Sequence, residues 1–170
     1  IRQWLKDNGQ PDTIPSGWQF LHIDTPTTPD TKTKVEEDEY VGLIENAISY
    51  NSVLSMIESD PQMHEDLAGW RVRPGAIDPD ITTGAGQYRA IGRTIAMAYA
   101  PLIQRKLERS LARLGNNQAE AELRELHRKV TNESATGEST CYAIVLSSLA
   151  GGSGAGMVTT VCDLIRGSST

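Results

Sequence analysis

The stretch "LSSLAGGSGAGM", residues 146–157, has almost no side-chain bulk at the point where an apolar run leads into a helical pattern; it holds four glycines, two alanines and three serines. The residues before the glycines, "TCYAIVLSSLA" (140–150), predict a buried β-strand, and "MVTTVCDLIRG" (157–167) has the spacing of a helix. A glycine-rich turn between a strand and a helix directs backbone N–H groups and the positive end of the helix dipole at one point. The sequence therefore predicts an anion site that needs no lysine.

Tight packing of the turn against its neighbours is the alternative explanation of these glycines, and two common nucleotide motifs do not fit the spacing. A P-loop requires Gly-Lys followed by Ser or Thr, whereas Gly156 is followed by Met157. A dinucleotide fingerprint requires glycines at i, i+2 and i+5, but from Gly152 or Gly84 the third position is Met157 or Arg89. This spacing disfavours a methyltransferase or an oxidoreductase cofactor domain.

The rest of the chain reads as helices and one further strand. The predicted elements are a helix over 1–7, a strand over 18–24, one or two helices over 35–57, a long helical region over 88–114 that breaks or kinks at Pro101, and a helix over 118–130. Residues 61–87 are predicted to be mostly irregular. Strands separated by helices favour an α/β fold, a Rossmann-like three-layer parallel sheet with helices on both faces. We expect a single domain over 1–170, with residues 88–130 contributing a helical hairpin.

Composition excludes several classes of function. A formal net charge of −6 disfavours a nucleic-acid or anionic-membrane partner, and no apolar run approaches the length of a membrane span. The two cysteines and three histidines lack metal-ligand spacing, so no metal site is predicted from them. A cytoplasmic location follows as the expectation. Four arginines are interpreted as solvated, with a cluster near the anion site as the alternative: Arg71, Arg73, Arg89 and Arg93.

Three segments of the chain together resemble the tubulin/FtsZ superfamily. "GGSGAG" (151–156) after an apolar strand is similar to the family signature Gly-Gly-Gly-Thr-Gly-Ser/Thr-Gly. "FLHIDT" (20–25) resembles the second nucleotide-side strand and its loop, and "GAGQYRAIGR" (84–93) resembles the third FtsZ loop, of the form Gly-Ala-Gly-x-x-Pro-x-x-Gly-Arg. Their order and approximate spacing match across nearly the whole chain. The resemblance is to bacterial tubulin-like proteins, a divergent branch distinct from FtsZ.

This resemblance implies a nucleotide site and its ligands. The α- and β-phosphates of GTP or GDP would be cradled by Gly151, Gly152, Ser153, Gly154, Ala155 and Gly156, with the Ser153 hydroxyl at a position where the family usually has threonine. The γ-phosphate would be sensed by Gly84, Ala85 and Gly86, and Asp24 and Thr25 would lie near the ribose or an accompanying Mg²⁺. The family also implies self-association into filaments and GTP hydrolysis that depends on assembly.

The chain departs from the family pattern at several points. Its signature has one glycine fewer than usual, and the proline of the third loop is replaced. The family's first strand and first glycine loop would precede Ile1, and its base-binding helix and catalytic-acid loop would follow Thr170, so the chain is expected to be a fragment. No catalytic residue is therefore assigned, and GTPase activity stays undecided. A nucleotide-independent structural or interaction module with a Rossmann-like fold is the alternative.

Overall fold

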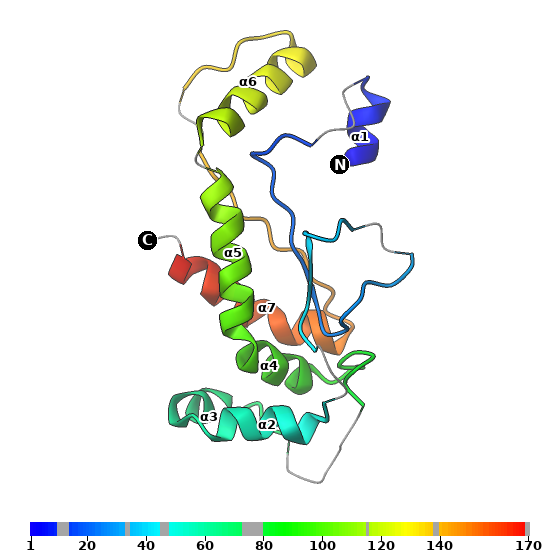
Figure 1. Ribbon diagram of the computed structural model, residues 1–170, viewed down its shortest axis with the longest axis vertical. Helices are drawn as coiled ribbons and strands as arrows, with labels where there is room; N and C mark the ends of the chain where they lie inside the picture. The colour runs from blue at the N-terminus through cyan, green and yellow to red at the C-terminus, as the bar shows by residue number, and fades with distance from the viewer. Residues whose placement is uncertain are drawn as a thin grey trace. The chain divides into compact units, whose positions relative to one another are not determined.

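The computed structural model describes residues 1–9, 14–32, 35–44, 48–72, 80–114, 116–137 and 140–168 (Figure 1). The chain divides into two compact units. The smaller unit comprises residues 1–20 and 108–143, and the larger unit comprises residues 21–107 and 144–170.

The larger unit contains a small parallel sheet and several helices. Strand β1 (His22–Asp24) pairs with β2 (Tyr40–Gly42), with His22 opposite Tyr40 and Asp24 opposite Gly42. The helices that lie wholly within this unit are α2 (Tyr50–Glu58), α3 (Pro61–Leu67), α4 (Arg89–Ala98) and α7 (Gly152–Ser168). Helices α4 and α7 lie side by side and form the most extensive helix contact (Figure 1). The structure thus has the mixed helix and strand content of an α/β fold.

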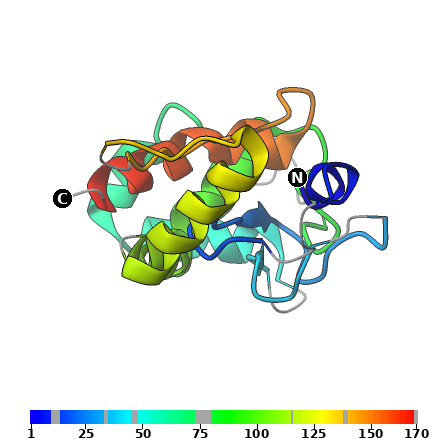
Figure 2. The same cartoon turned by 90° about the horizontal axis from the view of Figure 1, so that it is seen from above.

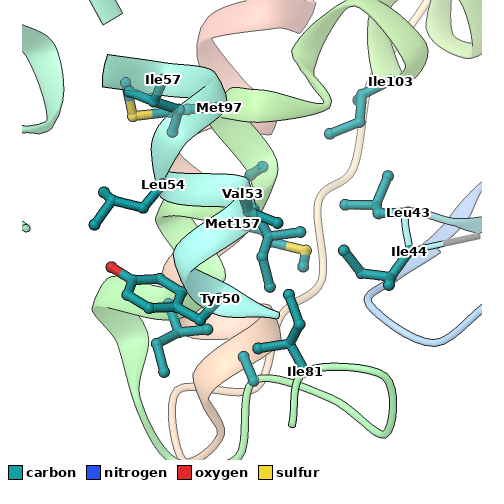
Figure 3. Packing of buried hydrophobic residues seen from close by; sticks show 14 of the residues in the cluster. Leu43, Ile44, Tyr50, Val53, Leu54, Ile57, Ile81, Met97, Ile103 and Met157 are labelled. Atoms are coloured by element: carbon teal, nitrogen blue, oxygen red, sulfur yellow. The ribbon is translucent and has the colours of Figure 1, made fainter. Parts of the chain in front are cut away.

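The apolar core of the larger unit joins β2, α2, α4 and α7. Figure 3 shows core side chains from α2, α4, α7 and the residues directly after β2, and the fully buried members of the core include Leu43, Tyr50, Val53, Ile57, Ile81, Ile91 and Ile95. Met157, the residue directly after the glycine run, is also buried here. Burial of this apolar surface fixes the first turns of α7 against the rest of the unit.

The smaller unit contains α1 (Arg2–Asp7), the end of α5 (Ala100–Leu114) and α6 (Asn117–Thr131). The side chain of Asn116 caps α6 by accepting a hydrogen bond from the Ala119 N–H. The backbone N–H and hydroxyl of Ser16 both donate to the carboxylate of Glu122, which lowers the pKa of that carboxyl below its ordinary value. Within the described residues of the smaller unit, α6 does not pack extensively on the end of α5, so the predicted hairpin is not seen there as a packed pair.

Two predictions about helices are confirmed, one for the N-terminal helix and one for the break in the long helical region. Helix α1 occupies the predicted segment, and the long helical region divides at Tyr99 into α4 and α5. Pro101 lies in the first turn of α5, where its missing N–H costs no intrahelical bond. Sequence chemistry alone was sufficient for these boundaries.

The prediction of one or two helices over 35–57 is wrong in its first half. Residues Tyr40–Gly42 form β2, and helix begins only at Tyr50, capped by the Ser49 hydroxyl. Val41 is buried because β2 pairs with β1, a contact that lies outside the local sequence. Whether a short segment forms a strand depends more on such pairing than on the intrinsic preference of its residues for β-structure.

The prediction that residues 61–87 are mostly irregular missed helix α3. The Asp60 carboxylate accepts hydrogen bonds from the N–H groups of Gln62 and Met63, and Pro61 occupies the first helical position. An aspartate cap followed by proline is a recognised signal for a helix start. The signal was present in the sequence.

The predicted strand over 140–150 is the largest difference. Figures 1 and 2 draw this segment as a coil, and no backbone–backbone hydrogen bond involves residues 141–149 within the described chain. Its apolar side chains are exposed: Tyr142 by 81%, Ile144 by 82% and Leu146 by 90%. The sheet of the described residues therefore has β1 and β2 alone. Within the same residues, no helix combines the length and apolar character needed to cross a bilayer.

Candidate functional site

Ser153 joins the three segments that the sequence analysis selected. Its hydroxyl oxygen lies 3.0 Å from that of Thr25 and accepts a hydrogen bond from the Ala85 N–H at 3.4 Å. Thr25 directly follows β1, and Ala85 belongs to the loop before α4. Residues that lie 68 and 128 positions before Ser153 thus meet it at the start of α7. All of them belong to the larger unit.

The start of α7 leaves backbone donors without partners. The helix begins at Gly152, inside the glycine run and five residues earlier than predicted. The Gly152 N–H donates to the Gly86 carbonyl at 2.8 Å, whereas the N–H groups of Gly151, Ser153 and Gly154 have no hydrogen-bond partner within the described chain. Unpaired amides at a helix N-terminus carry a partial positive charge. This turn can therefore accept an anion.

The glycines of the run have different surroundings. A Cβ added to Gly152 would lie 2.6 Å from the Ala85 carbonyl oxygen, and one added to Gly156 would overlap the Arg89 carbonyl oxygen. A Cβ on Gly154 would lie 2.9 Å from the Ser147 hydroxyl. Gly151 has no atom within 4 Å of that position. Close packing, the alternative that the sequence left open, therefore accounts for Gly152 and Gly156.

The loop at residues 84–86 needs glycine for its backbone shape. Gly84 has a φ of +129° and Gly86 a φ of +56°, values that L side chains rarely adopt. Ala85 between them is buried, and its carbonyl accepts the Tyr88 N–H at 3.1 Å. This turn sets the starting point of α4 beside that of α7.

Asp24 and Thr25 lie at the carboxyl end of β1, where ligands of open α/β sheets bind. Thr25 is fully buried, and its N–H donates to the Asp24 carboxylate at 2.7 Å. Partial burial, with a smaller contribution from the Asp24 charge, raises the pKa of Tyr40 to about 12. The Tyr40 hydroxyl donates to the Pro26 carbonyl at 2.7 Å.

We expect the raised pKa of Tyr40 to appear in a spectrophotometric titration. One phenol should ionise near pH 12, and Tyr40→Phe should remove that phase. Because the folded pKa lies above the unfolded value of 10.0, the contribution of Tyr40 to stability is present below pH 10 and lost as the pH rises towards 12. A high-pH phase unchanged by Tyr40→Phe would contradict this assignment; rapid pH jumps keep the protein folded during the measurement.

The described arginines among the four considered as a possible cluster near the anion site have different partners. Arg89 donates from Nη2 to the Leu149 carbonyl at 3.1 Å, just before the glycine run. Arg93 donates to the Thr159 hydroxyl, and its Cζ lies 5.3 Å from the centroid of the Trp70 ring. Arg71 pairs with Glu58 on α2, and Arg73 lies outside the described residues. Of the described three, Arg89 is the one bonded to the segment that leads into the glycine turn.

A comparison with protein families now identifies the chain. The family model described as "Tubulin like" matches residues 1–170. The chain belongs to the tubulin-like family. The resemblance inferred from three motifs is confirmed at this level, and those motifs are the segments that meet at Ser153. Searches of curated proteins and of solved structures returned no match.

Sequence reasoning missed one residue that shapes the site of this tubulin-like chain. A Cβ on Gly92 would overlap the Gly152 carbonyl oxygen, so this glycine in α4 allows the first turn of α7 to approach. A glycine inside a helical pattern was the available signal, because such a residue often marks a close backbone contact. Within the described residues, no group of three His, Cys, Asp or Glu could hold a metal ion.

Proposed function

We propose that this tubulin-like chain binds the phosphates of GTP or GDP at the start of α7. The observation that carries the proposal is the junction at Ser153, which brings the Thr25 loop and the Ala85 loop to the unpaired amides of the glycine turn. A nucleotide phosphate needs several donors that converge from different loops. The tubulin-like family supports guanine nucleotide as the ligand.

The electrostatics of the turn suit an anion. Neither α4 nor α7 has an acidic residue in its first turn, and the two helices begin beside each other, where the Gly152 N–H bonds to the Gly86 carbonyl. The positive ends of the two helix dipoles therefore have no compensating carboxylate within the first turn of either helix. When bound, the phosphate would supply oxygen acceptors for the amides of Gly151, Ser153 and Gly154.

The other residues of the proposal follow the family pattern. Gly84, Ala85 and Gly86 would contact the γ-phosphate, and Asp24 would lie near the ribose or hold Mg²⁺ through its carboxylate, a ligand type that this ion prefers. The chain's own residues bind and orient the nucleotide. Hydrolysis would require an acid from the next subunit of a filament, so GTPase activity and self-assembly in a bacterial cytoplasm belong to the proposal as family properties.

The finer fold is also part of the proposal. In a three-layer Rossmann-like sheet, residues 140–150 would form a strand that leads into the glycine turn. The exposed apolar side chains of Ile144 and Leu146 and the unpaired backbone of residues 141–149 support this assignment, because such a segment gains most by pairing in a sheet.

Titration of fluorescent GTP, ATP and S-adenosylmethionine into the protein tests the proposal. We expect selective binding of GTP, weakened about tenfold or more by Gly151→Val, because the new side chain meets no protein atom and fills space beside the turn. Gly69→Val is the matched control, since Gly69 also has nothing within 4 Å. Both variants should keep the thermal stability of the parent. Absence of GTP binding by the folded parent would overturn the proposal, and GTP-dependent light scattering tests assembly.

A nucleotide-independent structural module is the second candidate. The close approaches at Gly92, Gly152 and Gly156 favour it, because packing alone explains these three glycines. It predicts that Gly151→Val changes neither stability nor any interaction with nucleotide. The titration above separates the two candidates.

A further inference from the structure

We propose that Arg89 is the cation of the phosphate site, a binding residue that contacts the nucleotide phosphates directly. This inference rests on the proposed function and names a group that the glycine signature does not contain. In the third-loop pattern the position of Arg89 is occupied by proline, so the role does not follow from the resemblance. It follows from where the structure places the side chain.

Arg89 lies at the junction of the two helix starts. It is the first residue of α4, and its carbonyl oxygen is the atom that a Cβ on Gly156 would overlap, so its backbone packs on the first turns of α7. Its Nη2 atom donates to the Leu149 carbonyl at 3.1 Å. The guanidinium is therefore bonded to the carbonyl of the residue two positions before Gly151, and Gly151 is the first residue of the turn whose amide is unpaired within the described chain.

The guanidinium of Arg89 has N–H groups beyond the one that is bonded to Leu149. A guanidinium carries five N–H groups, and the bond to Leu149 is the one hydrogen bond that this side chain makes within the described residues. No carboxylate pairs with Arg89 there, and no acidic residue lies in the first turns of α4 and α7. Arginine can donate two parallel hydrogen bonds to two oxygens of a phosphate, a bidentate geometry. A polyphosphate would supply the counter-charge that the described residues do not.

Residues 146–157 contain no lysine or arginine of their own. The amides of Gly151, Ser153 and Gly154 supply partial charge from the backbone, and Arg89 adds a full charge from a neighbouring element. Arg89 replaces the proline of the third-loop pattern, and its positive charge strengthens anion binding. A chain whose signature has one glycine fewer than usual would gain phosphate affinity from this exchange.

Nucleotides with different numbers of phosphates test the role of Arg89. We expect Arg89→Ala to weaken binding of GTP about 10- to 100-fold, to weaken GDP less and to leave guanosine within about twofold. Arg89→Lys should keep part of the phosphate preference, because it retains charge without the two-pronged geometry. Arg105→Ala, an exposed arginine on α5 in the larger unit, is the control for a change in net charge.

A purely positional role through Leu149 makes a different prediction. Arg89→Gln keeps a neutral N–H donor that can reach the carbonyl of residue 149. If Arg89 served only to hold that carbonyl, Arg89→Gln would therefore bind GTP with the affinity of the parent. Parental affinity in Arg89→Gln, or equal losses for GTP and guanosine in Arg89→Ala, would overturn the inference. Thermal unfolding of each variant excludes a general loss of structure as the cause.

Tripolyphosphate separates failure of this inference from failure of the proposed function. If the parent does not bind GTP but tripolyphosphate raises its melting temperature, and Arg89→Ala removes that shift, the phosphate site stands and the guanine nucleotide proposal falls. If the parent binds GTP and Arg89→Ala binds it equally well, the inference falls and the proposed function stands. If neither ligand binds the folded parent, both are wrong.

Discussion

Gly156→Ala is expected to destabilise the larger unit by about 3 kcal/mol, near the upper end of the cost of overpacking. The added Cβ would overlap the Arg89 carbonyl oxygen and lie 2.6 Å from the Arg93 backbone nitrogen. Both are backbone atoms of α4, so no side-chain rotation can relieve the contact. Relief requires α4 and α7 to separate along the most extensive helix contact of the structure. Urea-induced unfolding followed by circular dichroism measures the change.

Gly167→Ala is the matched control for Gly156→Ala. It lies in the same helix and nothing is found within 4 Å of its Cβ position, so alanine should leave the protein unchanged or stabilise it by about 0.5–1 kcal/mol. Gly92→Ala makes the reciprocal change on α4, because its Cβ would overlap the Gly152 carbonyl oxygen. It should cost as much as Gly156→Ala. Similar, small effects at all three glycines would contradict the packing of α4 on α7.

The second large effect is expected from Ile91→Ala. Ile91 is completely buried in α4, and truncation of such a residue typically costs about 2–5 kcal/mol through lost burial and a residual cavity. Ile144→Ala makes the same chemical change at a side chain that is 82% exposed, and it should cost less than about 0.5 kcal/mol. The difference between the two free energies of unfolding is the quantity to measure.

The Ile91 and Ile144 pair also tests the three-layer sheet. A cost for Ile144→Ala equal to that for Ile91→Ala would contradict the exposed position of the segment and show that residues 144–149 pack in the folded protein. Hydrogen exchange gives a second readout of the same question. Rapid exchange of the amides of residues 144–149 is the result expected from the described conformation, in which they have no backbone partners, whereas slow exchange would support the strand proposed for residues 140–150.

Local chemistry was enough to predict several features. Pro101 marked the division between α4 and α5, and Asn116 lies where the sequence "GNN" predicted the end of one helix before the next. The glycines of the 84–86 loop predicted a turn, and two of them have the positive φ values that such a turn requires. Each of these signals acts within a few residues, where backbone sterics and capping hydrogen bonds decide the conformation.

Features that depend on distant residues escaped sequence reasoning. Strand β2 exists because it pairs with β1. The apolar residues of the region around it also permit a helix, so the local sequence did not reveal the strand. The start of α7 inside the glycine run, and the packing roles of Gly152 and Gly156, depend on α4 and the 84–86 loop. For Gly92, the sequence carried a weak signal whose meaning required the position of α7.

The sequence by itself determined the residue types of the candidate site: an unhindered glycine run, a second glycine loop and a polar pair after a strand, in the order typical of tubulin-like chains. Only the tertiary structure decided which of these glycines pack against the protein and which leave amides open, and that Ser153 holds the loops together. The reason is physical. A glycine permits close approach from either protein or ligand, and the neighbouring elements settle which of the two occupies the space.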